Sequence, residues 1–195
     1  MFSVEEIREN YKKLTDSQIE KIASEESKTL RREVLTVLKD EIELRKLNPS
    51  LINWVDAEND QFTDFEKTVL IKKIELLDCP NCGEKNTKLS GYEYITTVSM
   101  VIVCRKKINK KILCANCARS KKVHSFILTL LTGWWSGPGL LQTPYTLIKE
   151  IINSFYTKKI HERVLNDFLH ENNGMLRLHG KDEKSLHAIV KKYNE

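Results

Sequence analysis

Two short cysteine pairs decide how the middle of this chain folds: Cys79-Pro80-Asn81-Cys82-Gly83 and, further along, Cys114-Ala115-Asn116-Cys117. Each pair presents two thiols from a single turn, and Gly83 permits a tight turn whose backbone amides point at them. Two such pairs complete a tetrahedral shell of four sulfurs, which suits Zn²⁺. The spacing therefore predicts one structural metal site made by Cys79, Cys82, Cys114 and Cys117.

The residues between the two pairs have the composition of β-strands. Aromatic and β-branched side chains dominate at Tyr92, Tyr94, Ile95, Thr97, Val98, Val101, Ile102 and Val103. Asn109-Lys110 is expected to form a turn before Lys111-Ile112-Leu113, which predicts a β-hairpin joining the cysteine pairs. Residues 77–120 resemble the zinc-ribbon superfamily. The resemblance implies a structural Zn²⁺ but no particular biology, because ribbons serve transcription, translation, chaperone and purely structural roles.

Other uses of the cysteines stay open as alternatives, namely a redox pair, an iron–sulfur cluster or four unmetallated thiols. A shell filled by four cysteines leaves no position for water, so we do not expect catalysis at the metal. We expect the metal to be needed for local folding, since four thiolates would repel one another without it. Cys104 is expected to be a small buried apolar residue, with a substitute ligand or a reactive thiol as alternatives. His124 lies outside the usual ligand spacing.

Charge is distributed very unevenly along the chain. Residues 1–93 carry a net charge of −5, residues 94–149 carry 9 basic and no acidic groups, and residues 150–195 carry a net charge of +1. The candidate contacts for an anionic ligand are Arg105, Lys106, Lys107, Lys110, Lys111, Arg119, Lys121 and Lys122. We expect the cluster to be a solvated hairpin tip. Nucleic acid and anionic lipid are the alternatives, and nucleic acid is the less favoured because base-stacking aromatic residues are missing.

Residues 125–148 contain no charged side chain. Glycines and prolines break this segment into two apolar helical arms joined by a WWSGPG turn, the second arm beginning at Thr143-Pro144. Our leading interpretation is a buried hairpin in the core of a soluble protein. A membrane-surface or re-entrant hairpin and an oligomer interface are the alternatives, and for these Trp134 and Trp135 are the candidate membrane or partner contacts.

This region resembles a group of uncharacterised bacterial zinc-ribbon proteins with a GWW…P hydrophobic hairpin. The matching residues are Gly133-Trp134-Trp135, Pro138, Thr143-Pro144 and Ile148, within a resemblance that spans residues 77–155. Gly139 departs from the group, where tryptophan or another large residue commonly follows the proline. Residues 11–47 are similar to a helical segment recurrent in uncharacterised bacterial proteins, which implies no activity.

The remaining sequence favours amphipathic helices. Ser3-Val4-Glu5-Glu6 and the pair Thr15 and Gln18 have the form of capping boxes. Ser27 is expected to cap a third helix that stops before Asn48-Pro49, and Thr63-x-x-Glu66 to open a fourth. Further helices are expected around residues 160–169, where Asn172-Asn173-Gly174 forms the C-cap, and from Asp182 to Tyr193.

These observations predict a mostly helical α+β protein with a central four-cysteine zinc ribbon. The expected divisions are a helical subdomain (1–76), the ribbon (77–122), and an apolar helical hairpin with C-terminal helices (123–195). No catalytic motif is present, so we expect a non-enzymatic zinc-binding interaction or scaffold module that acts on a protein partner or at a membrane surface. A nucleic-acid-binding ribbon and an enzyme with a concealed site are the alternatives. The acidic opening MFSVEEIREN has no apolar run, which favours a cytoplasmic protein, with membrane association as an alternative.

Overall fold

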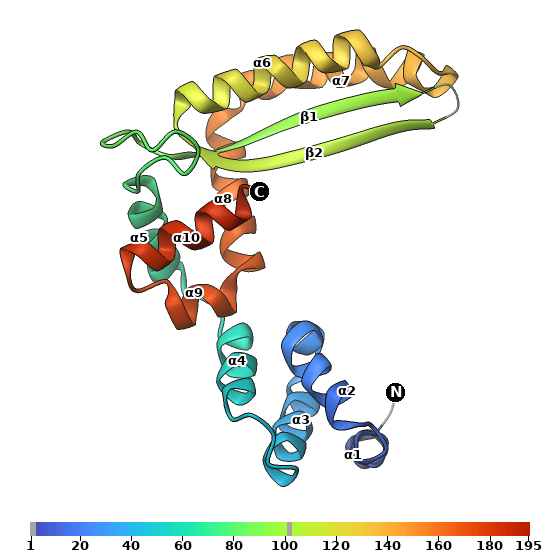
Figure 1. Cartoon of the computed structure of the whole chain (residues 1–195), viewed down its shortest axis with the longest axis vertical. Coiled ribbons are helices and arrows are strands. Elements are labelled where there is room, and N and C mark those ends of the chain that lie inside the picture. The colour runs from blue at the N-terminus through green and yellow to red at the C-terminus, as the bar shows by residue number, and fades with distance from the viewer. Residues whose placement is uncertain (1–2, 101–102) are drawn as a thin grey trace. The chain divides into compact units, whose positions relative to one another are not determined.

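The computed structural model describes residues 3–100 and 103–195 and confirms a mostly helical α+β fold (Figure 1). The strands are β1 (Ser90–Met100) and β2 (Val103–Leu113). The helices are α1 (Val4–Lys12), α2 (Asp16–Lys21), η1 (Ile22–Glu26, a π-helical turn), η2 (Ser27–Thr29, a 3₁₀ turn), α3 (Arg32–Leu44), α4 (Ser50–Asn59), α5 (Asp64–Glu75), α6 (Ala115–Thr132), α7 (Gly137–Phe155), α8 (Thr157–Glu171), α9 (Asn173–His179) and α10 (Glu183–Tyr193).

The chain folds into two compact units, and neither is a continuous stretch of sequence. The first unit contains Met1–Thr63 and Asn172–Asp182, and the second contains Asp64–Glu171 and Glu183–Glu195. The divisions expected from sequence after residues 76 and 122 stay a prediction.

The first unit is built on α1 to α4, and the two predicted capping boxes begin its first two helices. The Ser3 hydroxyl accepts the Glu6 N–H while the Glu6 carboxylate accepts the Ser3 N–H, and Thr15 and Gln18 repeat this exchange. Apolar side chains of these helices form one core, made by Tyr11, Ile19, Ala23, Val34, Val37, Leu38, Ile42 and Val55. The apolar positions of these amphipathic helices thus face a common core, as the sequence predicted.

The third helix differs from the prediction. Ser27 does not cap it but lies buried in the η2 turn, and α3 begins only at Arg32. The helix α4, which directly follows Pro49, was not predicted. Its first turn is fixed by the Asn48 side chain, which accepts the Ser50 N–H at 3.0 Å. The Asn48-Pro49 pair was interpreted only as a helix stop, although proline also favours the start of a helix.

The second segment of the first unit is held by a buried asparagine. The Asn173 side-chain amide donates to the carbonyls of Ala57, Glu58 and Asp60 at 2.8 to 3.0 Å, which closes the end of α4. Asn172-Asn173-Gly174 was expected only to end a helix. α8 does end just before it, at Glu171, but Asn173 opens α9.

The second unit is organised around the long antiparallel hairpin of β1 and β2. Ser90 pairs with Leu113 at its base and Met100 with Val103 at its far end. The turn predicted at Asn109-Lys110 is wrong, because these residues lie inside β2 opposite Tyr94 and Glu93. β2 is therefore longer than expected, whereas β1 ends at Met100, before the end of the Tyr92–Val103 run predicted for it. Val101 and Ile102, which were predicted to belong to a strand, lie outside the described residues.

One face of the hairpin packs on α8, with α5 and α10 beside that helix. The approach of α8 is close at Gly91, where a Cβ atom would lie 2.8 Å from the Val164 side chain. Phe168 and Tyr193 meet edge to face at 5.0 Å between ring centroids. Two ion pairs join the strands to α8: Lys110 with Asp167 at 2.7 Å and Glu93 with Arg163 at 2.8 Å.

Candidate functional site: a four-cysteine centre and an apolar helix pair

The structure brings together the four cysteines that the sequence singled out. The sulfurs of Cys79, Cys82, Cys114 and Cys117 all lie within 4.8 Å of one another. Tetrahedral coordination with Zn–S bonds of about 2.3 Å requires sulfurs about 3.8 Å apart, and Cys82 and Cys114 are separated by 3.8 Å. The four side chains could therefore hold one metal ion.

The first cysteine pair lies in a tight turn. The Gly83 N–H donates to the Cys79 carbonyl at 2.8 Å, and Gly83 has φ +71°, which glycine adopts without strain. The Asn81 side-chain amide donates to the Cys117 sulfur at 3.2 Å and so ties the turn to the second pair. This geometry is compatible with a zinc-ribbon knuckle.

The second pair begins a helix. Cys114 is the N-cap of α6, and Cys117 lies in the first turn, where the exposed backbone N–H groups favour negative charge. The preceding strand, β2, runs antiparallel to β1, so the pair lacks the parallel crossover in which thioredoxin-like motifs occur.

Proton affinities differ sharply within the cluster. Burial opposes ionisation of Cys79, but hydrogen bonds involving the backbone of Cys114, Cys82 and Asn81 bring its pKa down to about 7. Burial, reinforced by hydrogen bonding with Cys82, raises the pKa of Cys117 to about 12. Burial likewise raises the pKa of Cys114. Bringing four thiolates together thus requires a compensating cation.

Two neighbouring candidates lie outside this cluster. Cys104 is only half-buried, not buried as expected, and it pairs with Ser99 in the hairpin. Within residues 3–100 and 103–195, the four-cysteine group is the one cluster whose ligand atoms converge, and neither Cys104 nor His124 belongs to it.

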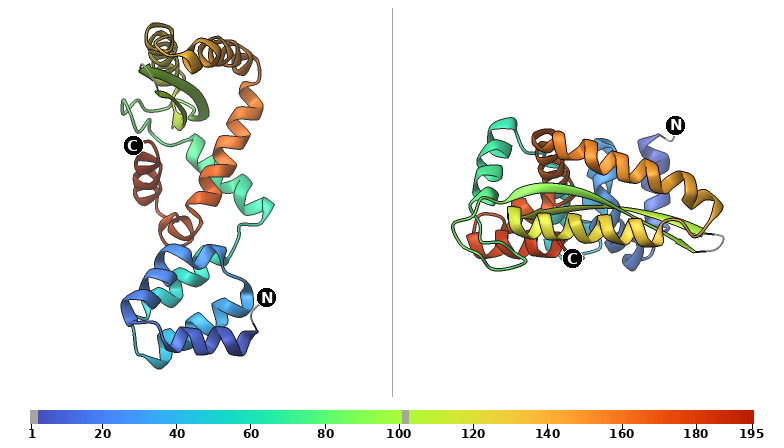
Figure 2. Two further views of the ribbon diagram at one scale, coloured as in Figure 1. Left: turned by 90° about the vertical axis from the view of Figure 1, so that its right-hand side faces the viewer. Right: turned by 90° about the horizontal axis from the view of Figure 1, so that it is seen from above.

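The uncharged segment forms the end of α6, the turn and most of α7, and these helices lie on either side of β1 (Figure 2). Their polar side chains bind the free edge of this strand. The Thr97 N–H donates to the Thr129 hydroxyl at 3.0 Å, and the Thr97 hydroxyl lies 3.0 Å from that of Thr146. The Ser125 hydroxyl donates to the Ile95 carbonyl at 2.8 Å. The strand edge is thereby satisfied without another strand.

Glu150 of α7 also binds the free edge of β1. Its carboxylate accepts the Ile95 N–H at 2.6 Å from a position only 8% exposed. Burial raises the pKa of Glu150, and the hydrogen bond from Ile95 and the charge of Lys122 oppose that rise. The inward face of the helix pair is therefore polar.

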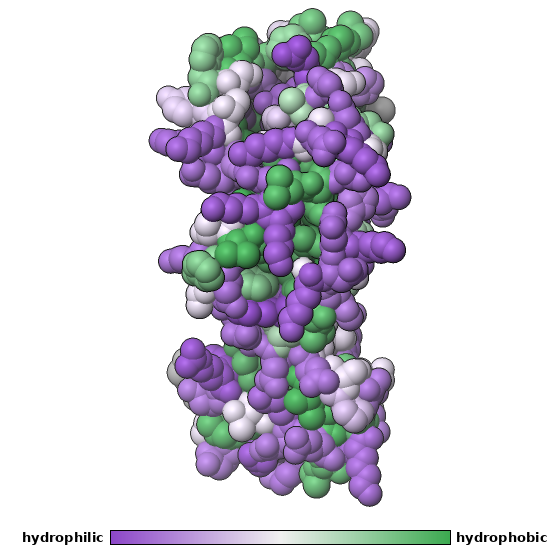
Figure 3. All heavy atoms as spheres, turned by 90° about the vertical axis from the view of Figure 1, so that its left-hand side faces the viewer, coloured by the Kyte–Doolittle hydropathy of each residue, from purple (hydrophilic) through white to green (hydrophobic). Residues whose placement is uncertain are grey.

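The outward face of the helix pair is apolar, so the expectation of a buried core hairpin is wrong. Its exposed large side chains, here called the apolar face, are Val123, Ile127, Leu130, Leu131, Trp134, Trp135, Leu140, Leu141, Tyr145, Ile148, Ile151, Ile152 and Phe155. Figure 3 shows hydrophobic side chains gathered along the top of the view, where α6 and α7 lie. Serine, threonine and glutamate occupy the inward positions, so the hydrophobic residues face outward.

The turn between the helices exposes both tryptophans. Trp135 is 70% exposed, and the indole N–H groups of Trp134 and Trp135 donate to the carbonyls of Leu130 and Leu131 at the end of α6. Ser136 caps α7, which begins at Gly137. The predicted start of the second arm at Thr143-Pro144 is wrong, since Pro144 lies inside the helix.

The basic residues do not gather at a hairpin tip. Those from Arg105 to Lys111 follow β2 along its length, and Arg119, Lys121 and Lys122 lie on the first turns of α6. Some have local partners: Lys106 lies 4.9 Å from the centre of the Tyr145 ring, and Lys122 lies 5.7 Å from that of Tyr92.

Sequence reasoning missed the buried polar residues on the inward side of the helix pair, which are Ser125, Thr129, Thr143, Thr146 and Glu150. A signal was present, because they recur every three or four positions within each arm of an apolar segment.

Comparison with protein-family models, with curated proteins and with solved structures finds no match for this chain. Among the described residues, no helix combines the length and the apolar character needed to cross a membrane.

Proposed function

We propose that this chain is a non-enzymatic protein that binds the surface of an anionic membrane, with a structural Zn²⁺ held by the four cysteines at the base of its binding element. The observation that carries the proposal is the reversed polarity of α6 and α7, whose polar residues bind β1 while large apolar residues face outward. Contiguous exposed apolar surfaces of this kind mark interaction sites.

The shape and composition of the apolar face favour a lipid bilayer interface. Two adjacent helices present it, with Trp134 and Trp135 at their shared turn, and indole rings favour the headgroup layer. Because no described helix is suited to crossing a membrane, the pair would lie in the plane of the interface.

Charge complementarity supports an anionic surface. Residues 94–149 contain 9 basic and no acidic groups, and a basic group near an anionic leaflet contributes roughly 1 kcal/mol. A two-fold dimer through the apolar face would instead bring the basic groups that flank this face in sequence, Lys122 and Lys149, into one interface with those of a second copy. The membrane therefore fits this surface better than a second copy of the chain.

The cysteine centre supports the proposal by fixing the start of α6. Cys114 and Cys117 anchor the first turn of this helix to the Cys79–Cys82 turn, from which β1 follows. Four sulfur ligands and no open position are typical of structural zinc. The metal would fix the position of α6 relative to the hairpin and would take no part in a reaction.

The decisive experiment is co-sedimentation of the full chain with vesicles of phosphatidylglycerol and phosphatidylcholine, compared with vesicles of phosphatidylcholine alone. We expect binding to the anionic vesicles and a blue shift of tryptophan fluorescence. Leu131→Glu/Leu141→Glu changes two exposed side chains of the apolar face, 65% and 81% exposed. Since a buried leucine contributes roughly 1.5–3 kcal/mol, the partition coefficient should fall at least about tenfold.

Leu44→Glu/Leu76→Glu is the matched control, because these leucines are equally exposed (73% and 80%) but lie outside α6 and α7. It should bind like the unmodified chain. Absence of vesicle binding, or an equal loss in both double variants, would contradict the proposal. So would a dimer in solution that Leu131→Glu/Leu141→Glu dissociates.

A further inference from the structure

The hairpin has a second edge, formed by β2, on the side away from α6 and α7 (Figure 1). The register with β1 shows which backbone groups lie on it. The N–H groups of Ile95 and Thr97 point away from β2, toward α7 and α6. In an antiparallel pair the cross-strand partners of such residues also point outward, and here these partners are Ile108 and Lys106. The outer edge of β2 is thus a surface distinct from the apolar face.

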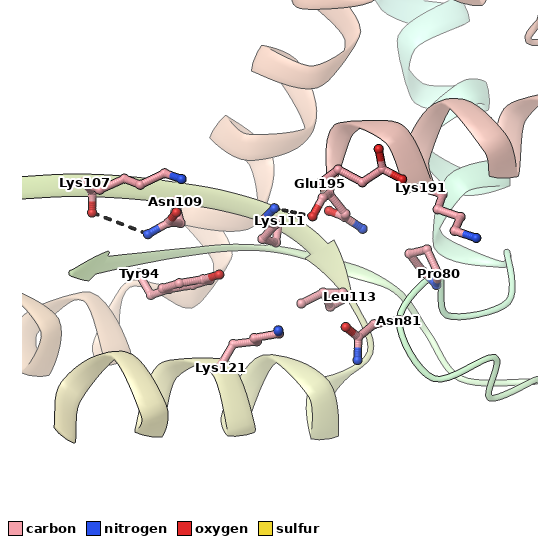
Figure 4. A pocket seen from close by; sticks show the side chains of 11 residues that line it. Pro80, Asn81, Tyr94, Lys107, Asn109, Lys111, Leu113, Lys121, Lys191 and Glu195 are labelled. Atoms are coloured by element: carbon pink, nitrogen blue, oxygen red, sulfur yellow. Dashed lines mark hydrogen bonds between the residues drawn. The ribbon is translucent and has the colours of Figure 1, made fainter. Parts of the chain in front are cut away.

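At its base this edge is capped in the way that an added strand would cap it. The Asn194 side chain accepts the Ile112 N–H at 2.8 Å and donates to the Ile112 carbonyl at 2.7 Å. One residue of a neighbouring antiparallel strand makes the same two hydrogen bonds. Figure 4 shows this end of β2, where the Lys111 ammonium donates to the Asn194 carbonyl. The base of the edge therefore already binds an amide group in the manner of a strand.

The rest of the edge, from Lys110 toward the far end of the hairpin, is open. None of the residues that the structure describes hydrogen-bonds to the outward-facing backbone groups of Lys106, Ile108 and Lys110. The Ile108 side chain is 47% exposed, although its cross-strand partner Ile95 is fully buried. A row of unpaired N–H and C=O groups is a template for pairing with an extended chain. This segment can therefore accept a further strand.

Charge determines which kind of strand the edge can accept. Of the basic residues on β2, Lys110 forms an ion pair, whereas Arg105, Lys106 and Lys107 have no ion-pair partner among the described residues. A second copy of β2 is disfavoured, because a two-fold axis at Ile108 would place Lys106 directly opposite Lys110. Like charges that lie directly opposite one another destabilise a sheet. An acidic strand would instead compensate the positive charge.

We infer that the outer edge of β2 binds an extended acidic segment of a partner protein as an added antiparallel strand. The backbone of this segment exchanges hydrogen bonds with Lys106, Ile108 and Lys110. Its acidic side chains lie opposite Arg105, Lys106 and Lys107, and an apolar side chain lies opposite Ile108. In this mode of recognition main-chain hydrogen bonds supply the affinity and alternate side chains supply the specificity. The basic residues that oppose pairing with a second copy thus select an acidic partner.

The probe is a fluorescein-labelled peptide of sequence TTVEEET, titrated with the full chain at constant ionic strength while fluorescence anisotropy is measured. Placed antiparallel from Lys110 to Cys104, the peptide sets its valine opposite Ile108 and its three glutamates opposite Arg105–Lys107. We expect saturable binding with one peptide per chain.

Two N-methylated forms of the peptide separate strand pairing from simple charge attraction, since both keep the charge of the parent. Methylation of the valine and the central glutamate removes N–H groups that face β2 and should weaken binding at least about tenfold. Methylation of the first and last glutamates removes N–H groups that face away from β2 and should leave binding unchanged. Equal loss with both methylated peptides, or no binding of the parent peptide, would overturn the inference.

Charge reversal tests the chemistry of the partner. Arg105→Glu/Lys107→Glu should lose the peptide TTVEEET and bind TTVKEKT in its place, because the two opposed pairs exchange their signs. Lys72→Glu/Lys73→Glu makes the same charge change at two exposed positions of α5 in the same unit and should bind TTVEEET like the unmodified chain. If both double variants lose this peptide equally, overall charge attracts it and the inference is wrong. A dimer in solution that Arg105→Glu/Lys107→Glu alters would assign the edge to a second copy and contradict the inference as well.

This test is independent of the proposed membrane function. Leu131→Glu/Leu141→Glu alters the apolar face on α6 and α7 and leaves β2 unchanged, so it should retain peptide binding even where vesicle binding is lost.

Discussion

The hydroxyl of Thr97 in β1 lies 3.0 Å from the hydroxyl of Thr146 in α7, and neither side chain is exposed to solvent. The same Thr97 donates its backbone N–H to Thr129 in α6. One residue of the hairpin thus joins both helices that carry the apolar face. A buried polar contact of this kind specifies the helix positions more sharply than apolar packing would, because each hydroxyl needs a partner.

Removing one of these two hydroxyls should lower the free energy of unfolding more than removing both. In Thr97→Val the Thr146 hydroxyl stays buried without its partner, so the free energy of unfolding should fall by about 1–3 kcal/mol. In Thr97→Val/Thr146→Val no such orphan remains, and stability should recover most of that loss. Urea denaturation of the three proteins measures the difference. A double variant that loses the sum of two single losses would contradict the role of the hydroxyl pair.

Glu150 should make stability depend on pH. The folded protein holds the Glu150 proton more tightly than the unfolded chain, whose carboxyl has the ordinary pKa of 4.5. This contribution is complete below that value and is lost as pH rises from 4.5 through the raised pKa. Glu150→Gln keeps an acceptor for the Ile95 N–H but cannot ionise, so its stability relative to the unmodified chain should increase as the pH rises.

Denaturation series from about pH 4 to about pH 8 test this expectation. Glu150→Ala is the companion variant, because it leaves the buried Ile95 N–H without an acceptor and should lose about 1–3 kcal/mol at low pH, a loss that shrinks as the pH rises. A stability difference between the Gln variant and the unmodified chain that stays constant with pH would show that the carboxyl does not titrate as inferred.

Gly139 should tolerate no side chain. A Cβ atom there would overlap the Gly133 carbonyl oxygen and lie 2.6 Å from the Ser99 hydroxyl. Gly139→Ala should therefore destabilise the protein by about 1–3 kcal/mol. Gly137→Ala, two residues earlier in the same helix, meets no atom within 4 Å and should be neutral or slightly stabilising. Thermal unfolding of the pair distinguishes close packing from a general effect on the helix.

Metal removal should loosen the cysteine centre first. Elemental analysis of the purified chain should give one zinc per molecule, and Cys114→Ala should lose it. After chelation, amide hydrogen exchange should accelerate in the Cys79–Cys82 turn and the first turn of α6. Exchange in the core helices of the first unit, such as α3, should not change, since they belong to the other compact unit. Unchanged exchange around the cysteines, or iron in place of zinc, would refute a structural zinc site.

Local patterns predicted the parts of this fold that depend on neighbouring residues. The capping boxes at Ser3 and Thr15 follow from chemistry within a few positions. Each cysteine pair is likewise recognised from its own two-residue spacing, and the shared chemistry of the four thiols predicted that the pairs meet across the hairpin. The hairpin turn was misplaced because Asn109-Lys110 has turn-like composition. Asn109 and Lys110 in fact lie within β2, where they pair with Tyr94 and Glu93 of β1. Local composition does not reveal this pairing, because the partner residues lie far away in sequence.

The apolar segment shows a different limit of sequence reasoning. Its mean composition indicated burial, but which face is buried depends on what the neighbouring element offers. The edge of β1 offers unpaired N–H and C=O groups, so the threonines, Ser125 and Glu150 turn inward and leave the leucines and tryptophans outside. The inward face of each helix could therefore be identified only from the position of β1.

The interleaving of the two units constrains how the chain can assemble as it is made. The first unit needs Asn172–Asp182, and the second needs Glu183–Glu195. The Asn194 side chain accepts the Ile112 N–H and donates to the Ile112 carbonyl, so β2 keeps an open edge until that residue arrives. On the ribosome, the first unit cannot close before Asn172–Asp182 has emerged, nor the second before Glu183–Glu195. Until then α4 lacks its hydrogen bonds from Asn173 and β2 lacks those of Asn194, whereas all four cysteines are already present.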